Sequence, residues 1–141
     1  MEQIRLSGRL LDTNVLINLV FARSAALDNR FAAAALSREP LFLSTISLYE
    51  FRFGAERSKR RSFQLAALDR FLERASVANF DGADAERAAL LKGALATQGQ
   101  LIGPYDLLIA GQALARGWTV VTGHTHEFSR VEGLQLEDWT T

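Results

Sequence analysis

Short apolar runs alternate with longer segments of helical periodicity along the chain. The run at residues 9–12 precedes Thr13 and Asn14 and then VLINLV at helical spacing, which predicts a strand, a turn and a helix. Similar runs predict further strands at 41–44, 77–80, 119–122 and 134–136. Helical spacing predicts helices at 25–36, 46–53 (ended by Gly54), 63–74, 81–95 and 104–116 (opened by Pro104).

Alternating strands and helices predict an α/β fold, with a parallel central sheet and helices on both faces. The β-branched run at 119–122 is typical of a strand buried on both faces. The chain has only two prolines, no internal repeat and no Gly/Ser-rich linker, so we expect a single domain over 1–141. In such sheets, functional sites lie beyond the carboxyl ends of the strands.

Composition narrows the possible partners and cofactors. Sixteen basic and sixteen acidic residues give a net charge of zero, so any contact with nucleic acid must be local. The chain has no cysteine, which excludes disulfides, thiolate nucleophiles and zinc knuckles and fits a reducing compartment. The opening MEQIRLSGR lacks the apolar run of a signal peptide, and no apolar stretch is long enough for a membrane helix. We therefore expect a cytoplasmic protein with no membrane partner.

Asp12 closes the first predicted strand, where the sheet rule places a functional site. A structural alternative is equally good at this point. Asp12, Thr13 or Asn14 could cap the following helix, a contribution of about 1 kcal/mol.

Glu50 is predicted to lie within the apolar face of its helix. Ile46, Tyr49 and Phe53 stand at i, i+3 and i+7 of a helical stripe, and Glu50 takes the i+4 position. A buried carboxylate must be hydrogen-bonded, protonated or bound to a cation. The alternative is a capping box formed by Ser47 and Glu50. We favour the functional interpretation.

Asp106 and Glu127 are the remaining acidic candidates. Asp106 opens a helix that continues as the largely apolar LLIAGQALA, and its neighbours Tyr105 and Leu107 indicate a turn that is not a solvated surface. The helix dipole alone favours an acid at this position, by some tenths of a kcal/mol. Glu127 lies in the polar segment TGHTHEF, and only its place after a predicted strand makes it a candidate.

The four acids Asp12, Glu50, Asp106 and Glu127 are expected to converge at one edge of the sheet. Carboxylates that lie close together repel one another, and this repulsion raises their pKa values unless a counter-charge is present. A divalent cation removes this conflict. Oxygen ligands suit Mg²⁺ or Mn²⁺, and such a site can activate water and stabilise a phosphodiester during displacement.

Other patterns are weaker candidates. His124 and His126 form H-x-H, but two histidines in a loop are more often surface residues, and no third ligand is evident. A basic cluster that could contact phosphates is more typical of a solvated helix start. It consists of Arg57, Lys59, Arg60 and Arg61. Neither G-x-x-x-x-G-K-[ST] nor G-x-G-x-x-G occurs, so nucleotide-binding loops are not supported.

Four segments in order resemble the VapC-type toxins of the PIN-domain family. They are LLDTNVLI at 10–17, ISLYEFRFGAE at 46–56, IGPYDLLIAGQAL at 102–114 and VVTGHTHEFSRVEGLQLEDW at 120–139. The resemblance implies a PIN-like fold and a Mg²⁺-dependent endoribonuclease that cleaves structured RNA, with tRNA a frequent target. It also implies a homodimer held inactive by a cognate VapB-type antitoxin.

The same resemblance implies roles for the acids. Asp12 and Asp106 match the principal metal-binding aspartates, Glu50 matches the acid of the second motif, and Glu127 occupies the region of the fourth acid. We therefore expect Asp12 and Asp106 to bind Mg²⁺, Glu50 to complete the shell and help activate water, and Glu127 to support a second, weaker cation. Neighbouring polar side chains are expected to orient these groups. They are Thr13, Asn14 and Thr122.

Two departures from the family pattern concern this site and its supporting helix. Gly123 and His124 stand where similar proteins often have asparagines, which bears on the fourth acid. Gly111 and Gln112 replace a common Ala-His pair.

Two rival interpretations remain. One is a catalytically silent PIN domain that binds RNA or a protein as a scaffold, although all four acids are retained. The other is a haloacid-dehalogenase-like phosphatase, in which Asn14 would replace the second aspartate of the D-x-D opening.

Overall fold

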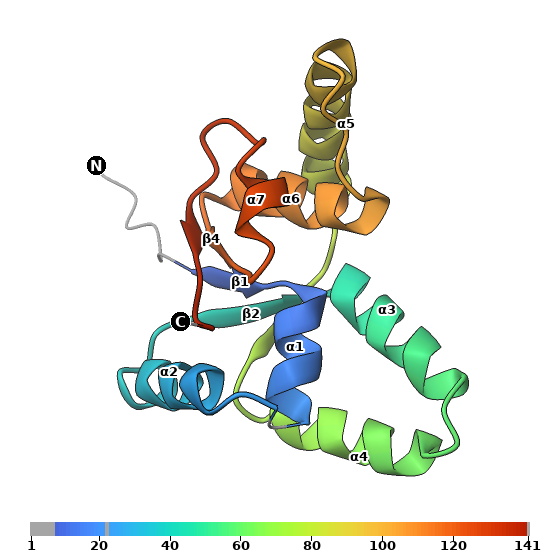
Figure 1. The fold of residues 1–141 in the computed structure, drawn as a ribbon, viewed down its shortest axis with the longest axis vertical. Helices are drawn as coiled ribbons and strands as arrows, with labels where there is room; N and C mark the ends of the chain where they lie inside the picture. Colours follow the sequence, from blue (N-terminus) through green and yellow to red (C-terminus); the bar gives the residue numbers. More distant parts are fainter. Residues whose placement is uncertain (1–7, 22, 141) are drawn as a thin grey trace.

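A parallel five-stranded sheet forms the centre of the molecule. The structure is a computed structural model, and it describes residues 8–21 and 23–140. The strands are β1 (Arg9–Leu11), β2 (Leu41–Ser44), β3 (Ser76–Ala78), β4 (Thr119–Val121) and β5 (Leu136–Glu137). Their order is β3-β2-β1-β4-β5, and each neighbouring pair is parallel (Figure 1). The prediction of an α/β fold with a parallel sheet is confirmed.

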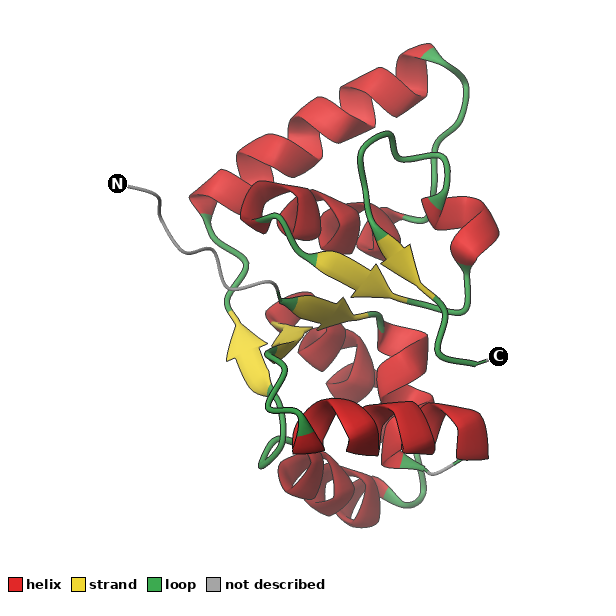
Figure 2. Cartoon of the chain, turned by 90° about the vertical axis from the view of Figure 1, so that its left-hand side faces the viewer, coloured by secondary structure: helices red, strands yellow, loops and turns green. Residues whose placement is uncertain are grey.

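Helices cover both faces of the sheet (Figure 2). One face packs against α1 (Thr13–Val20), α2 (Ala25–Leu36), α3 (Thr45–Glu56) and α4 (Arg61–Phe71). The other packs against α5 (Gly82–Thr97), α6 (Pro104–Arg116) and the short α7 (Thr125–Phe128). Because strand side chains alternate between faces, Leu11 and Val121 lie in the first core while Leu10 and Val120 lie in the second.

Several predicted boundaries are wrong. The helix predicted to end at Gly54 continues to Glu56, because an exposed glycine costs a helix only about 1 kcal/mol and does not stop it. The strand predicted at 77–80 is β3, which ends at Ala78, and Phe80 instead donates its N–H to the Thr45 hydroxyl at 3.1 Å. The strand predicted at 134–136 is β5, which begins at Leu136 after a turn.

Two helices and one loop also differ from the prediction. The helix predicted at 63–74 runs from Arg61 to Phe71, and the one predicted at 81–95 runs from Gly82 to Thr97, with Asp81 as its cap. The segment TGHTHEF, interpreted as a polar loop, contains α7, which buries Phe128.

Helices α5 and α6 pack closely enough to require a glycine. A Cβ added at Gly111 would lie 2.6 Å from the Cα of Ala88, so only glycine permits this approach. At the end of α6, Arg116 donates to the buried Asp84 at 2.8 Å, which ties α6 to the first turn of α5. The neighbouring Gln112 is fully buried and donates to the Ala78 carbonyl at 3.3 Å.

The strand order creates a crevice beside β1. The chain runs outward from β1 through β2 to β3, and then returns to place β4 on the opposite side of β1. In open parallel sheets, such a reversal leaves a ligand-binding crevice at the carboxyl ends of the two central strands. Leu11 pairs with Val121, so the residues that follow them, Asp12 and Thr122, emerge side by side.

Within residues 8–21 and 23–140, no helix is long and apolar enough to cross a membrane. The expectation of no signal peptide concerns mainly residues 1–7, which lie outside the described residues.

Candidate metal centre

Asp12 lies at the carboxyl end of β1 and is only 1 % exposed. Its backbone N–H donates to the Val121 carbonyl at 3.0 Å, which extends the sheet by one residue. Its Oδ1 accepts from the Val15 N–H at 2.7 Å, and its Oδ2 accepts from the Thr122 hydroxyl. Both interpretations of Asp12 are therefore compatible, because it caps α1 through one oxygen and faces the crevice beside β4. Burial raises the pKa of Asp12, although the hydrogen bonds from Thr122 and Val15 oppose that rise.

Glu50 does not lie in the apolar face of α3, so that prediction is wrong. The buried residues of this helix are Ser47, Phe51 and Ala55. Tyr49 and Phe53, taken as part of the apolar stripe, are 55 % and 54 % exposed. The helix contacts α1 and α4, and its buried stripe runs along one row of positions at spacing i, i+4 and i+8.

Glu50 nevertheless points to the site, through Thr13. The Thr13 hydroxyl donates to Glu50 Oε1 at 2.6 Å and lies 3.0 Å from the Ser47 hydroxyl. The capping box of Ser47 and Glu50 does not form, since Ser44 caps α3 by accepting from the Ile46 N–H at 3.0 Å. Glu50 is thus oriented by a residue of α1, as we expected for Thr13.

Asp106 lies in the first turn of α6 and carries the largest electrostatic conflict of the site. Burial, followed by repulsion from Glu127, Asp12 and Glu50, raises its pKa to about 6, while His124 opposes the rise. Glu127, Asp12 and Glu50 therefore all lie within electrostatic reach of Asp106. Of the neighbours taken to indicate a buried turn, Leu107 is buried but Tyr105 is 40 % exposed.

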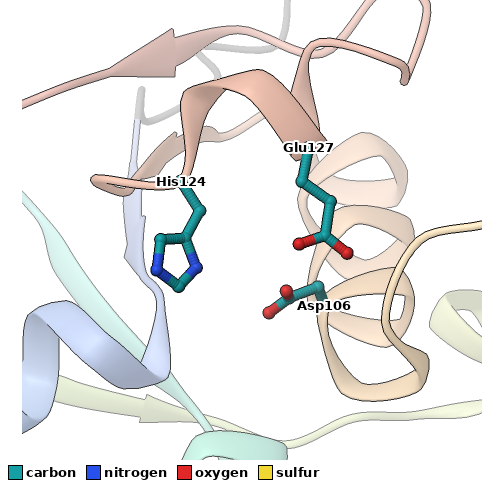
Figure 3. Close-up of side chains that lie close together, drawn as sticks. All are labelled: Asp106, His124 and Glu127. Atoms are coloured by element: carbon teal, nitrogen blue, oxygen red, sulfur yellow. The ribbon is translucent and has the colours of Figure 1, made fainter.

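Asp106 also forms a compact cluster with His124 and Glu127 (Figure 3). One ligand atom from each of the three residues lies within 4.8 Å of the others. Glu127 is anchored by the Gly103 N–H, which donates to its Oε1 at 2.5 Å. His124 is exposed, as expected for a surface histidine, but the fold places it beside two carboxylates that the sequence pattern did not connect to it. The sequence signal was H-x-H three positions before Glu127, but only the fold brings Asp106 to it.

A pocket of about 270 Å³ opens beside these acids. It is lined by Thr13, Asn14, Ile17, Glu50, Gly103, Pro104, Tyr105 and Asp106. A second hollow, lined in part by Phe21 and Phe51, shares Ile17 and Glu50 with it. The acidic centre therefore continues into a more apolar groove between α1 and α3.

The basic cluster after α3 does not belong to this centre. It lies in the connection between α3 and α4, at the far end of α3 from the sheet (Figure 1). Arg61 pairs with Glu56 at 2.6 Å, and the Arg60 guanidinium lies 4.1 Å from the centre of the Phe63 ring. These contacts fit the solvated helix start that we favoured.

The donor set fits a divalent cation. Asp106, His124 and Glu127 form one cluster, and burial together with Glu127, Asp12 and Glu50 disfavours the ionised form of Asp106, so a positive charge placed there would favour it. A bound dication would supply that charge. The same arrangement can hold a phosphodiester next to an activated water.

Known proteins share this sequence and architecture. The model of the PIN domain family matches residues 9–134. The tRNA(fMet)-specific endonuclease VapC of Shigella flexneri is 37 % identical over 131 residues, which cover 93 % of this chain and 97 % of that protein. The crystal structure of VapBC2 from Rickettsia felis bound to a promoter DNA fragment has a TM-score of 0.88 at 30 % identity, covering 94 % of this chain and 98 % of that one.

The DNA-bound VapBC of Salmonella typhimurium has a TM-score of 0.87 at 34 % identity, again covering 94 % of this chain and 98 % of that one. These matches extend over almost the full length of both partners, and they include the strand ends and helix starts that carry the acids. The chain therefore belongs to the PIN domain family, in its VapC group of nucleases.

Proposed function

We propose that this protein is a Mg²⁺-dependent endoribonuclease that cleaves structured RNA, with tRNA as the first candidate substrate. The observation that carries the proposal is the gathering of acids around Asp106: Glu50 lines the same pocket, and burial together with Glu127, Asp12 and Glu50 raises the pKa of Asp106 to about 6. The relative from Shigella flexneri, a tRNA(fMet)-specific endonuclease, supports tRNA as the class to test.

In this proposal, Asp12 and Asp106 hold the ion, and Glu127 supports a second, weaker one. When bound, the ion would polarise the phosphodiester and lower the pKa of the attacking water. Glu50, fixed by the Thr13 hydroxyl, accepts the proton of that water. The water oxygen bonds to phosphorus, one bridging P–O bond breaks, and the departing oxygen takes up a proton from solvent water.

Two exposed tyrosines beside the pocket support a nucleic acid substrate. Tyr49 immediately precedes Glu50 and Tyr105 immediately precedes Asp106, and their ring centres lie 5.7 Å apart at an angle of 57°. Unpaired bases stack on such rings with about 1–3 kcal/mol each. Since the net charge is zero, local contacts of this kind must supply the affinity that bulk charge does not.

The partners we propose are a VapB-type antitoxin and a second copy of the chain. The similar structures from Rickettsia felis and Salmonella typhimurium are VapBC complexes. A basic side chain from an antitoxin segment would replace the cation at Asp106 electrostatically. Light scattering of the isolated protein and of the complex measures both assemblies. We further propose that residues 1–141 act as one domain, and that they act in the cytoplasm, where tRNA is found.

The proposal is tested by incubating the antitoxin-free protein with total tRNA and Mg²⁺, beside an EDTA control and the Asp12→Asn variant. Asparagine keeps an oxygen that can cap α1 but loses the charge, so we expect it to fold and to cleave at least about 100-fold more slowly. Discrete products lost in both controls support the proposal.

Full activity of Asp12→Asn would overturn the assignment of this residue. No cleavage of tRNA, rRNA or mRNA by the metal-loaded protein would instead favour a silent scaffold. Circular dichroism and thermal unfolding establish that the variant is folded.

A further inference from the structure

The cluster of Asp106, His124 and Glu127 differs chemically from the all-oxygen site expected from the acids alone. The imidazole of His124 faces the space beside the two carboxylates, which approach each other from α6 and α7 (Figure 3). Because one atom of each residue lies within 4.8 Å of the others, a single ion can contact all three. The three side chains present two oxygen donors and one nitrogen donor.

A nitrogen donor changes which ion is preferred. Mg²⁺ binds almost entirely to oxygen and keeps several waters, whereas Mn²⁺, Co²⁺ and Zn²⁺ accept imidazole readily. We infer that His124 is a metal ligand at the position of the second, weaker ion, beside Asp106 and Glu127, and that this position prefers a first-row transition-metal dication to Mg²⁺. This inference deepens the proposed function, and its catalytic consequence rests on that function.

The surroundings of His124 hold it beside the acids. Its backbone N–H donates to the Thr122 hydroxyl at 2.9 Å, and the same hydroxyl donates to Asp12. The Asn14 amide nitrogen lies 3.3 Å from both ring nitrogens of His124. A carboxamide turned by half a rotation presents its oxygen instead, so Asn14 can accept from one ring N–H while the other ring nitrogen binds the ion.

The position of His124 also makes the inference testable without disturbing the fold. Its side chain is exposed, so ions reach it and its replacement removes no core packing. His126 is exposed as well and lies two residues away, but it is not part of the cluster. His126→Asn is therefore a matched control for His124→Asn.

The direct test is pulsed electron paramagnetic resonance of the Mn²⁺-loaded protein, which detects a ¹⁴N nucleus bonded to the ion. We expect a nitrogen coupling in the wild type and in His126→Asn, and its loss in His124→Asn. Isothermal titration with Mn²⁺ and with Mg²⁺ supplies a second readout. The ratio of the Mn²⁺ affinity to the Mg²⁺ affinity should fall by about tenfold or more in His124→Asn, and it should not change in His126→Asn.

Absence of a nitrogen coupling in the wild type overturns the inference, as does an unchanged affinity ratio in His124→Asn or a failure to bind Mn²⁺. An RNA cleavage assay of the same samples distinguishes failure of this inference from failure of the proposed function. Cleavage without a nitrogen coupling removes His124 from the metal shell and leaves the nuclease intact. A nitrogen coupling without cleavage of any RNA leaves the metal site intact and removes the nuclease.

Discussion

The site makes ionisation of one of its own residues, Asp106, unfavourable. Its carboxyl group lies in the first turn of α6, a position that ordinarily favours a negative charge. Burial and three neighbouring acids outweigh that advantage and raise its pKa to about 6. The metal-free protein therefore carries a strain that binding of a cation would relieve.

This strain predicts a pH-dependent effect of Asp106→Asn on stability. A carboxyl group whose pKa is raised by folding binds its proton more tightly in the folded state, so its stabilising contribution is present below the unfolded pKa near 3.8 and is lost as the pH rises through about 6. At pH 7.5 we expect the metal-free variant to be more stable than the wild type by about 1 kcal/mol, a figure reduced for solvent screening. Near pH 4 the difference should vanish.

Chemical unfolding of both proteins in EDTA, at pH 4 and at pH 7.5, measures this difference. Glu86→Gln, on the exposed surface of α5, serves as the control for loss of a single negative charge. A destabilised Asp106→Asn at pH 7.5 would contradict the electrostatic account.

The sequence arguments for the individual site residues agree with the structure to different degrees. Asp12 was located by its place after a strand, which is a property of parallel sheets and holds here. Glu50 was selected from an apolar stripe that is largely exposed, and it lies at the site because Thr13 holds it there. His124 was only a weaker candidate because one of its neighbours in the cluster is Asp106, and no local pattern encodes a contact between residues so far apart in the chain.

At the scale of elements, the pairing of α5 with α6 holds the first turn of α6, and hence Asp106, in place. The two helices meet where Gly111 lies against Ala88, and the Arg116–Asp84 contact joins the end of one to the start of the other. Asp84 is 1 % exposed, and its carboxylate accepts hydrogen bonds from that guanidinium and from the Asp81 N–H, which offset the cost of burying it.

Gly111→Ala should therefore destabilise the protein by about 2 kcal/mol, because a methyl group placed 2.6 Å from the Ala88 backbone forces the helices apart. Gly93→Ala is the matched control. Gly93 is also a glycine within this helix pair, but a Cβ there meets no atom within 4 Å. The control should gain up to about 1 kcal/mol from helix propensity. Equal effects of the two substitutions in urea unfolding would refute the close-packing argument.

Element boundaries were less predictable from the sequence than the elements themselves. The Gly54 stop failed because a helix ends at a glycine only when the backbone there turns, and the buried Ala55 directly after it keeps the last turn of α3 packed. Strand β3 is only three residues long, and its end depends on the Thr45 hydroxyl that takes the Phe80 N–H. Such long-range contacts are not visible in local periodicity.

For the molecule as a whole, the strand order places acids from four separate segments at one edge of the sheet. Asp12 follows β1, Glu50 lies in the helix after β2, Asp106 opens the helix before β4, and Glu127 lies in α7 after β4. The alternation of strands and helices allowed the parallel sheet to be predicted, but it did not give the strand order. Because the acids come from four separate segments, a divalent cation that binds all of them should stabilise the whole fold.

We expect Mn²⁺ at about 100 times its dissociation constant to raise the free energy of unfolding by about 2.7 kcal/mol, which corresponds to a rise in Tm of roughly 5–10 °C. The shift should disappear in excess EDTA and in Asp106→Asn, because Asp106 belongs to both proposed positions of the ion. Scanning calorimetry in the presence and absence of the ion measures it. A wild-type Tm that does not change with Mn²⁺ would mean that these acids do not bind the ion in the folded state.

The hydrogen bond from Thr122 to Asp12 joins residues that are 110 positions apart. A ribosome adds about 5–20 residues per second, so on the order of 10 s separates the synthesis of these two partners. From the addition of Glu50 onward, the nascent polypeptide contains Asp12 and Glu50 but still lacks β4 and α7, which bring Thr122, His124 and Glu127 to them. The order of synthesis therefore delays assembly of the centre. A chain released early, from a stalled or truncated message, lacks the residues that β4 and α7 contribute to it.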